Sequence, residues 1–274
     1  MLKGKSVVVT GSTSGIGLAV ARAFAKEGAN VTINGFGDKA AIEKERTGLE
    51  QEFGVKAIYS GADMTKSAEI AEMIKTTEKT FGAVDVLINN AGIVRGNRYF
   101  WETDNGEDTR PTMQVNALAP MYITREFLPG MIANAYRSSR IVNIASAAGT
   151  LANPRMAVYA ASKAALIGWS DSLRLELEQA DHTNVKVTTV TPSYISTGMF
   201  AGARGPALAP VLEPEYVVDR VWRAMLAGAP LVELPWSVGV SRALRGILPT
   251  RLFDRIVGDG FGVYRSMERF TGRG

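Results

Sequence analysis

A tyrosine and a lysine four residues apart, Tyr159 and Lys163, are the side chains best suited to chemistry. They fall within a helical pattern, so the spacing places both on one face. A phenol with an ordinary pKa of about 10 is a weak base at neutral pH. A lysine ammonium one turn away favours the tyrosinate and lowers that pKa. We therefore predict that Tyr159 takes a proton from an alcohol or returns one to a carbonyl.

A serine, Ser146, stands thirteen residues before Tyr159, at the end of an expected strand. Its hydroxyl is placed to hydrogen-bond the oxygen of a substrate. A Tyr-x-x-x-Lys pair is common by chance, and the serine makes the combination more specific. The three residues predict interconversion of a secondary alcohol and a ketone.

The segment from Thr10 to Gly17 contains three glycines, follows an apolar run and begins a helical pattern. Gly11 permits a tight turn, Gly15 lets the backbone approach a pyrophosphate, and Gly17 lets the helix lie close to the sheet. The helix N-terminus then offers N–H groups and a partial positive charge to phosphates. An ordinary structural loop is the alternative, and the strand–turn–helix context favours a dinucleotide site.

The elements that must position these residues alternate along the chain. Short apolar runs predict strands at 6–10, 30–34, 55–60, 84–89, 140–145 and 185–191, and longer patterns predict helices at 15–28, 38–53, 67–81, 105–136 and 156–180. Such runs are typical of strands buried on both faces of a parallel sheet. The fold class is therefore α/β: a single Rossmann-type, doubly wound parallel sheet with helices on both faces. We expect one domain over 1–274, with a substrate loop at 192–214 and a helical C-terminal tail at 237–274.

Composition excludes several classes of site. The chain has no cysteine and one histidine, His182, so a disulfide, a cysteine-ligated metal, a histidine zinc site and a Ser-His-Asp triad are excluded, and we expect no metal. No run approaches the roughly eighteen apolar residues that span a bilayer. An apolar strand pattern begins within a few residues of Met1, so we expect no signal peptide and a cytoplasmic protein.

Three motifs together resemble the short-chain dehydrogenase/reductase family: Thr10–Gly17 in the form TGxxxGIG, Asn89-Asn90-Ala91-Gly92 after the fourth strand, and Asp63 after the third. The resemblance covers nearly the whole chain. It implies a catalytic tetrad of Asn116, Ser146, Tyr159 and Lys163, and it implies that the helices carrying Asn116 and Tyr159 pack between subunits of a homotetramer or dimer. The predicted cofactor-binding residues are Gly11, Thr13, Ser14, Gly15, Ile16, Gly17, Phe36, Asp63, Met64, Asn90, Ala91, Gly92, Tyr159, Lys163, Pro192, Ile195 and Thr197.

A proline supports the expected role of Asn116. In a helix the carbonyl of Asn116 would accept a hydrogen bond from the N–H of residue 120, which is Pro120 and has none. The free carbonyl can then hold a water that, in the family, links to the lysine and relays protons. An ordinary kinked helix is the alternative.

The choice between NAD and NADP is usually made after the second strand, where an acid binds the ribose hydroxyl and a base binds a 2′-phosphate. This chain has Phe36 at the expected position, and Ser14 is also neutral. We favour NAD, and Lys39 keeps NADP open.

The two parts of the chain indicate different substrates. Residues 1–93 resemble bacterial 3-hydroxybutyrate dehydrogenases, which hold a small carboxylate with Gln, His and Lys side chains. The matching positions here are Val94, Ala148 and Met156, and a carboxylate without donors in an apolar pocket is strongly disfavoured. From about residue 94 onward the chain is similar to members acting on retinoid, steroid or other lipophilic alcohols. A mosaic joined near Ile93, natural or artificial, and one ancestor with an altered pocket both explain this.

We therefore favour an NAD(P)-dependent oxidoreductase with a hydrophobic small-molecule substrate. The first alternative is a 3-hydroxybutyrate dehydrogenase, for which Arg155, four residues before Tyr159, could bind the carboxylate. A catalytically silent cofactor-binding protein and a lipid-surface protein are alternatives of other classes.

The net positive charge of the chain lies in its C-terminal tail. Residues 240–274 hold seven arginines and three acidic residues, which equals the net charge of +4 for the whole chain. Scattered arginines usually solvate helix faces, so we expect no nucleic-acid partner and regard membrane contact as the less favoured reading. The apolar sets Leu244, Ile247, Leu248 and Leu252, Phe253, Ile256 suit a lid, a subunit interface or a membrane-facing surface.

Overall fold

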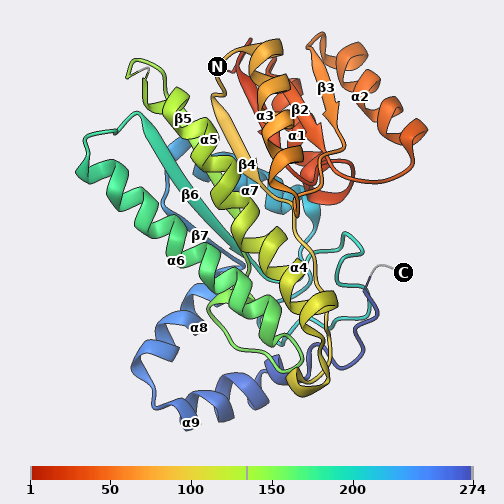
Figure 1. Cartoon of the computed structure of the whole chain (residues 1–274). Helices are drawn as coiled ribbons and strands as arrows, with labels where there is room; N and C mark the ends of the chain where they lie inside the picture. Colours follow the sequence, from red (N-terminus) through yellow and green to blue (C-terminus); the bar gives the residue numbers. More distant parts are fainter. Residues whose placement is uncertain (1, 134, 273–274) are drawn as a thin grey trace.

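The computed structural model describes residues 2–133 and 135–272, and it contains one parallel sheet in the order β3-β2-β1-β4-β5-β6-β7 (Figure 1). The strands are β1 (Ser6–Val9), β2 (Asn30–Asn34), β3 (Ala57–Ser60), β4 (Val86–Asn89), β5 (Ser139–Ile144), β6 (Val185–Pro192) and β7 (Leu231–Leu234). All six predicted strands are present, with ends shifted by at most two residues. The α/β, doubly wound prediction is confirmed.

Helices connect the strands. The α-helices are α1 (Gly15–Lys26), α2 (Lys39–Phe53), α3 (Ser67–Phe81), α4 (Arg110–Met113), α5 (Ala119–Ala133), α6 (Ala157–Gln179), α7 (Pro214–Ala227), α8 (Trp236–Ile247) and α9 (Thr250–Phe253). Short 3-10 helices are η1 (Phe100–Glu102), η4 (Ala147–Gly149) and η6 (Val263–Arg265), and π-helical turns are η2 (Asn105–Thr109), η3 (Gln114–Leu118) and η5 (Asp254–Gly260). Among the described residues 2–133 and 135–272, no helix is both long enough and apolar enough to cross a membrane.

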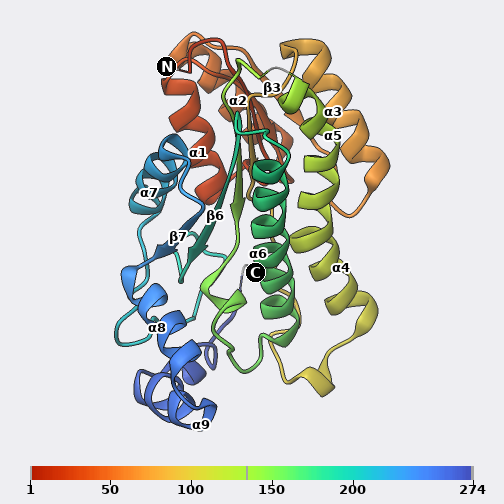
Figure 2. The ribbon, with the colours of Figure 1, turned by 90° about the vertical axis from the view of Figure 1, so that its left-hand side faces the viewer.

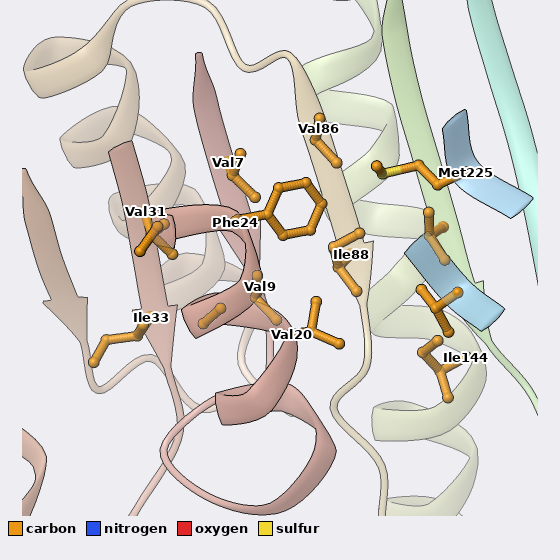
Figure 3. Close-up of a cluster of buried hydrophobic side chains, with 14 of the residues drawn as sticks. Val7, Val9, Val20, Phe24, Val31, Ile33, Val86, Ile88, Ile144 and Met225 are labelled. Carbon is orange, nitrogen blue, oxygen red and sulfur yellow. The ribbon is translucent and has the colours of Figure 1, made fainter. Parts of the chain in front are cut away.

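The helices form a layer on each face of the sheet, as Figure 2 shows with the sheet seen nearly edge-on. Side chains of α1, α2 and α7 share one buried cluster with the strands, and those of α3, α5 and α6 share another. Along β1 the side chains alternate, because Val7 and Val9 join the first cluster and Val8 joins the second. In the first cluster the Phe24 ring of α1 lies among the valines and isoleucines of β1 and β4 (Figure 3).

The helix predicted over 105–136 is present as an unbroken helical run from 105 to 133. Two of its turns, η2 and η3, are π-helical, which the sequence did not predict. Pro120 has no N–H to donate to Asn116, and the turn widens there, with the Ala119 N–H donating to the carbonyl of Gln114. Residue 134 lies outside the described residues, and residues 135–136 form a turn.

The C-terminal third contains more regular structure than the sequence patterns predicted. Helix α7 and strand β7 extend the sheet beyond the six expected strands. Segment 192–214 is a loop, as predicted, apart from the last residue of β6 and a bridge between Ile195 and Leu212. The tail is helical through α8, α9 and η5, and its described residues after 265 are not.

Helix α6 carries Tyr159 and is therefore one of the two helices expected at a subunit interface. Its apolar residues Leu166 and Leu173 are buried within the chain's own core and are not available to a partner. Trp169 is half-buried and lines a surface groove with Tyr122 and Arg125 of α5. Assembly into an oligomer stays a prediction.

A buried carboxylate, Asp85, joins the start of β4 to the N-terminus and to the segment before β5. It accepts hydrogen bonds from Lys5 Nζ at 2.9 Å, the Ser6 N–H at 2.8 Å and the Arg137 guanidinium. Burial opposes its charged form, but the bonds from Arg137, Ser6 and Lys5 outweigh burial and hold the pKa of Asp85 below its usual value.

Replacing Asp85 with asparagine should lower the free energy of unfolding at pH 7 by about 2 kcal/mol, because partly hydrated Lys5 and Arg137 lose their shared partner. A depressed folded pKa stabilises the protein above the unfolded pKa near 4 and stops doing so as pH falls. The deficit should therefore shrink below about pH 4 in urea unfolding. Asp171→Asn, which breaks an exposed pair with Arg174, is the control and should change stability little. A deficit unchanged by acid would contradict this account.

Candidate active site

The turn after β1 is packed against the end of β4. Asn90 Nδ2 donates to the carbonyls of Thr10 and Gly11, both at 2.9 Å, and Thr10 Oγ1 accepts from the N–H groups of Asn90 and Ala91 at 3.0 Å. A Cβ on Gly17 would lie 2.2 Å from the Gly11 carbonyl oxygen and 2.5 Å from Asn90 Nδ2. Only glycine therefore allows α1 to begin this close to the strand ends.

A cleft opens along the carboxyl edge of the sheet where β1 lies between β2 and β4, the point at which the strand order reverses. Every predicted cofactor-binding residue lines this cleft, from the glycine turn through Asn90–Gly92 to Tyr159, Lys163 and Thr197. The sequence analysis missed other lining residues: Asn34, Gly35, Ala62, Ile93, Val115, Ile144, Ala145, Ser193, Met199 and Phe200. Most directly follow or precede a predicted residue, so proximity at the strand ends was the available signal.

The cleft fits a dinucleotide on two observations. The N-terminus of α1 faces it through Gly15, Ile16 and Gly17, and unpaired N–H groups of a first helical turn suit phosphate. Because Gly11 and Gly17 have no Cβ atom, no side chain projects from the backbone at these two positions of the turn. Gly11 has φ +63°, a conformation that side-chain-bearing residues rarely adopt.

At the end of β2 an amide replaces the acid expected in many dinucleotide sites. Asn34 is buried, accepts from the Gly11 N–H at 3.2 Å and donates to the carbonyls of Ser60 and Ala62. Phe36 lies at the cleft rim with 66% of its surface exposed. Neither side chain offers charge to a ribose or a phosphate.

Asp63 also lines the cleft and accepts hydrogen bonds from the Thr65 N–H and hydroxyl, both at 2.8 Å. Burial raises the pKa of Asp63, but these two bonds and the nearby Lys66 outweigh it and leave the pKa below its usual value. Its carboxylate is therefore ionised near neutrality and held in place.

Asn116 lies behind the cleft wall and does not line it. Its Oδ1 accepts from the Ile93 N–H at 2.8 Å, and its Nδ2 donates to the Ile93 carbonyl at 2.9 Å and to Ser162 Oγ at 3.1 Å. The side chain thus ties the segment after β4 to α6, across the π-helical turn. Whether its backbone carbonyl holds a water stays a prediction.

Lys163 is buried and donates from Nζ to the carbonyl of Ile144, at the end of β5, at 2.9 Å. Burial lowers the pKa of Lys163 to about 8. The ammonium nitrogen lies 5.8 Å from the centroid of the Tyr159 ring. The helical spacing does bring the two side chains together, as predicted.

The predicted lowering of the Tyr159 pKa below its ordinary value is wrong in this structure. Burial raises the pKa of Tyr159 to about 12, and a hydrogen bond with Ser146 offsets only part of that rise. Both hydroxyl groups are enclosed, since Tyr159 and Ser146 are buried residues. Desolvation of the phenolate is the largest influence and sets the direction of the shift. Tyr159 therefore keeps its proton at neutral pH.

A second, apolar pocket adjoins the cleft, and Ser146, Tyr159, Ser193 and Phe200 line both. Its other walls come from η4, the loop after β6, α8 and η5, and include Ala148, Leu151, Met156, Leu208, Val238, Val257 and Phe261. None of the described residues that line this pocket is charged. Three apolar residues stand at the positions considered for binding the carboxylate of 3-hydroxybutyrate: Val94, Ala148 and Met156. They pack in one cluster with Tyr159.

The C-terminal residues close this region, which the sequence patterns did not predict. Met267 is buried against Tyr159, and Phe270 packs beside Phe200. Ser266 Oγ meets Tyr194 Oη at 2.7 Å, and Asn153 Nδ2 donates to both oxygens. These bonds fasten the tail to the loop after β6.

Arg155 does not line the pocket. Its guanidinium lies 5.1 Å from the centre of the Tyr99 ring, which stacks on Trp101. The carboxylate-binding role considered for Arg155 has no support in this arrangement.

The fold and site define a class of protein. A sequence model of the short chain dehydrogenase family matches residues 5–206, and the chain belongs to that family. It is accordingly an NAD(P)-dependent oxidoreductase.

Two relatives of this chain are named for different alcohol substrates. The D-beta-hydroxybutyrate dehydrogenase of Cupriavidus necator is 38% identical over 197 residues, which are 72% of this chain and 73% of that protein. Epidermal retinol dehydrogenase 2 of Mus musculus is 32% identical over 274 residues, covering 98% of this chain and 86% of its own. Since the second similarity runs through both parts of the chain, a mosaic is not required.

A solved structure shows the same fold. The alcohol dehydrogenase of the archaeon Thermococcus sibiricus, complexed with 5-hydroxy-NADP, superposes with a TM-score of 0.70 at 24% identity. The match covers 84% of this chain and 94% of that one.

Gly17→Ala should weaken NADH binding at least ~tenfold and lower the melting temperature, because its Cβ would displace the Gly11 turn or Asn90. Gly48→Ala is the matched control, since no atom lies within 4 Å of its added Cβ on α2. It should leave binding unchanged and stabilise the helix by about 0.5–1 kcal/mol. Titration of NADH fluorescence and thermal melts measure both. Equal affinities in the two variants would refute the close-contact argument.

Proposed function

We propose that this protein interconverts a bulky apolar secondary alcohol and its ketone, prefers NAD over NADP, and uses Tyr159 as the general acid and base. One observation carries the proposal. The hydrogen-bonded hydroxyls of Tyr159 and Ser146 lie where the cofactor cleft meets an apolar pocket without charged walls. A carbonyl placed there would meet two hydroxyl groups and the cofactor cleft at once.

The residues divide the work as their contacts suggest. A bound nicotinamide supplies or accepts the hydride. Tyr159 holds its proton at neutral pH and is suited to give it to the carbonyl oxygen during reduction, while Ser146 hydrogen-bonds the same oxygen. Lys163 stabilises the tyrosinate left behind, and the Ile144 carbonyl positions its ammonium group. Oxidation of the alcohol uses the same groups in reverse.

The preference for NAD rests on the walls of the cleft. Among the described residues that line the cleft, Lys163 has the only positively charged side chain. It lies beside Tyr159, at the end of the cleft that meets the substrate pocket. At the end of β2 stand Asn34, Gly35 and Phe36, which give a 2′-phosphate no positive partner. A phosphate there would be bound less well than a ribose hydroxyl.

The substrate class rests on the apolar pocket. Burying apolar surface contributes about 25 cal/mol per Å², so a bulky hydrophobic ketone gains more from these walls than a four-carbon acid does. The relatives named for retinol and estradiol support this reading. The similarity to D-beta-hydroxybutyrate dehydrogenases supports 3-hydroxybutyrate as the second candidate, although the pocket offers its carboxylate no cation.

Tyr159→Phe should lower kcat at least ~100-fold while the affinity for NADH changes little, because only the transferable proton is removed. Steady-state kinetics and NADH titration separate the two effects. Tyr122→Phe, on the exposed surface of α5, is the control and should behave like the unaltered protein. Turnover near normal in Tyr159→Phe would exclude the proposed acid.

The cofactor preference predicts a higher kcat/KM with NADH than with NADPH. Phe36→Arg should move the ratio toward NADPH by about 1–3 kcal/mol of binding energy, through a charge-assisted bond to the 2′-phosphate. Lys39→Ala tests the other nearby cation and should leave the ratio unchanged if Lys39 does not reach the phosphate. A preference for NADPH in the unaltered protein would show that the walls at Phe36 do not decide the choice.

A substrate panel tests the whole proposal. Aryl and long-chain secondary alcohols and ketones should exceed 3-hydroxybutyrate more than ~tenfold in kcat/KM, because apolar burial favours them. Nicotinamide absorbance, with NAD(H) and NADP(H) side by side, measures the rates. If 3-hydroxybutyrate is the best substrate and Arg155→Ala abolishes that preference, the proposed substrate class is wrong.

A further inference from the structure

Helix α8 has an inner face that lines the substrate pocket and an outer face that is apolar and exposed. Ser237, Val238 and Ser241 line the substrate pocket on its inner face. On its outer face Trp236, Val240, Ala243 and Ile247 recur at helical spacing and are exposed, with Trp236 at 70% and Ile247 at 77%. A helix that needed only to close a pocket would carry polar residues on its outer side.

The following turns, α9 and η5, repeat this arrangement. Phe253 and Val257 are buried, and Val257 lines the substrate pocket. Leu252 and Ile256, four residues apart, are exposed, and Arg251 and Arg255 lie next to them at the same spacing. The outward surface is therefore apolar and basic at once. We call residues 236–256 of this surface the tail face.

The tail face stands at one end of the molecule. In Figures 1 and 2 helices α8 and α9 project at the lower end, beyond the carboxyl edge of the sheet, and the segment that leads into α4 reaches the same end. That segment carries three exposed aromatic residues, Tyr99, Phe100 and Trp101.

The arginines of the tail face differ in their partners. Arg242 pairs with Glu233, and Arg245 donates to the carbonyl of Thr150. For Arg251 and Arg255 the described residues provide neither an ion pair nor a hydrogen-bond acceptor. Two exposed guanidinium groups beside exposed Leu252 and Ile256 suit a surface that is apolar inside and anionic outside.

We propose that the tail face docks the protein on an anionic lipid surface, with Ile247, Leu252 and Ile256 entering the interface and Arg251 and Arg255 meeting the headgroups. A second copy of the chain fits less well. A twofold interface would bring two copies of the same net-basic patch together and would supply no excess of negative charge for Arg251 and Arg255. An anionic lipid surface satisfies both components of the patch.

This inference rests on the proposed function for its purpose. Lipophilic alcohols partition into membranes, and the helices that would touch the lipid are those whose inner faces line the substrate pocket. Docking would place the pocket at the surface that holds the substrate. Binding to vesicles needs no turnover, so its failure is distinct from failure of the proposed reaction.

Co-sedimentation with two kinds of vesicle tests the proposal. One kind is phosphatidylcholine alone, and the other is phosphatidylcholine with about 30% of the anionic lipid phosphatidylserine. One variant replaces Ile247, Leu252 and Ile256 with serine, and a second replaces Arg251 and Arg255 with glutamine. The control combines Leu226→Ser and Arg220→Gln on α7, which removes an exposed leucine and an exposed arginine elsewhere on the surface. Circular dichroism and NADH binding check that each variant is folded.

The unaltered protein and the α7 control should bind the anionic vesicles, and binding should fall with added salt. A basic residue near an anionic surface contributes about fivefold in partitioning, so the double glutamine variant should lose roughly 25-fold. The triple serine variant should lose at least ~tenfold on both vesicle types. Absence of binding, or equal binding by all variants, would overturn the proposal. A dimer by light scattering that the triple serine variant dissociates would assign the tail face to a second copy instead.

Discussion

The position of the whole site depends on one close approach, that of the turn after β1 to the end of β4. Gly17 makes it possible because a Cβ there would overlap the Gly11 carbonyl, and Asn90 fixes it with two hydrogen bonds to the turn. The cleft, the N-terminus of α1 and the segment leading to Ile93 all take their places from this contact. Asn116 then holds Ile93 from behind and links it to α6, which carries Tyr159 and Lys163.

Burial sets the protonation of Tyr159 and Lys163. Helix α6 brings the two side chains together, and both are removed from water. The pKa of Tyr159 is raised and that of Lys163 is lowered, and each shift favours the neutral group. Tyr159 therefore keeps its proton at neutral pH, and Ser146 is its hydrogen-bond partner. The apolar residues around it belong to β5–α6, to the loop after β6 and to the C-terminal tail, so the pocket depends on segments far apart in the sequence.

The C-terminal tail has two relations to this pocket. Its last described part is fastened inside by the bonds among Ser266, Tyr194 and Asn153, and Met267 packs on Tyr159. Its helices α8 and η5 form an outer wall whose other side is apolar, basic and exposed. The apolar pocket and a surface patch thus share the same helices.

The sequence alone determined six of the seven described strands, the glycine turn and the cofactor cleft. These depend on local patterns, namely apolar runs, glycine spacing and strand-end motifs, and every residue assigned to the cleft lies in it. The spacing of Tyr159 and Lys163 likewise follows from helix geometry. Only the tertiary structure decided the direction of the Tyr159 pKa, the place of Asn116 behind the wall, the two π-helical turns within the 105–136 helix and the closure of the pocket by Met267. Desolvation and long-range packing depend on which distant segments cover a residue, and no local spacing contains that information.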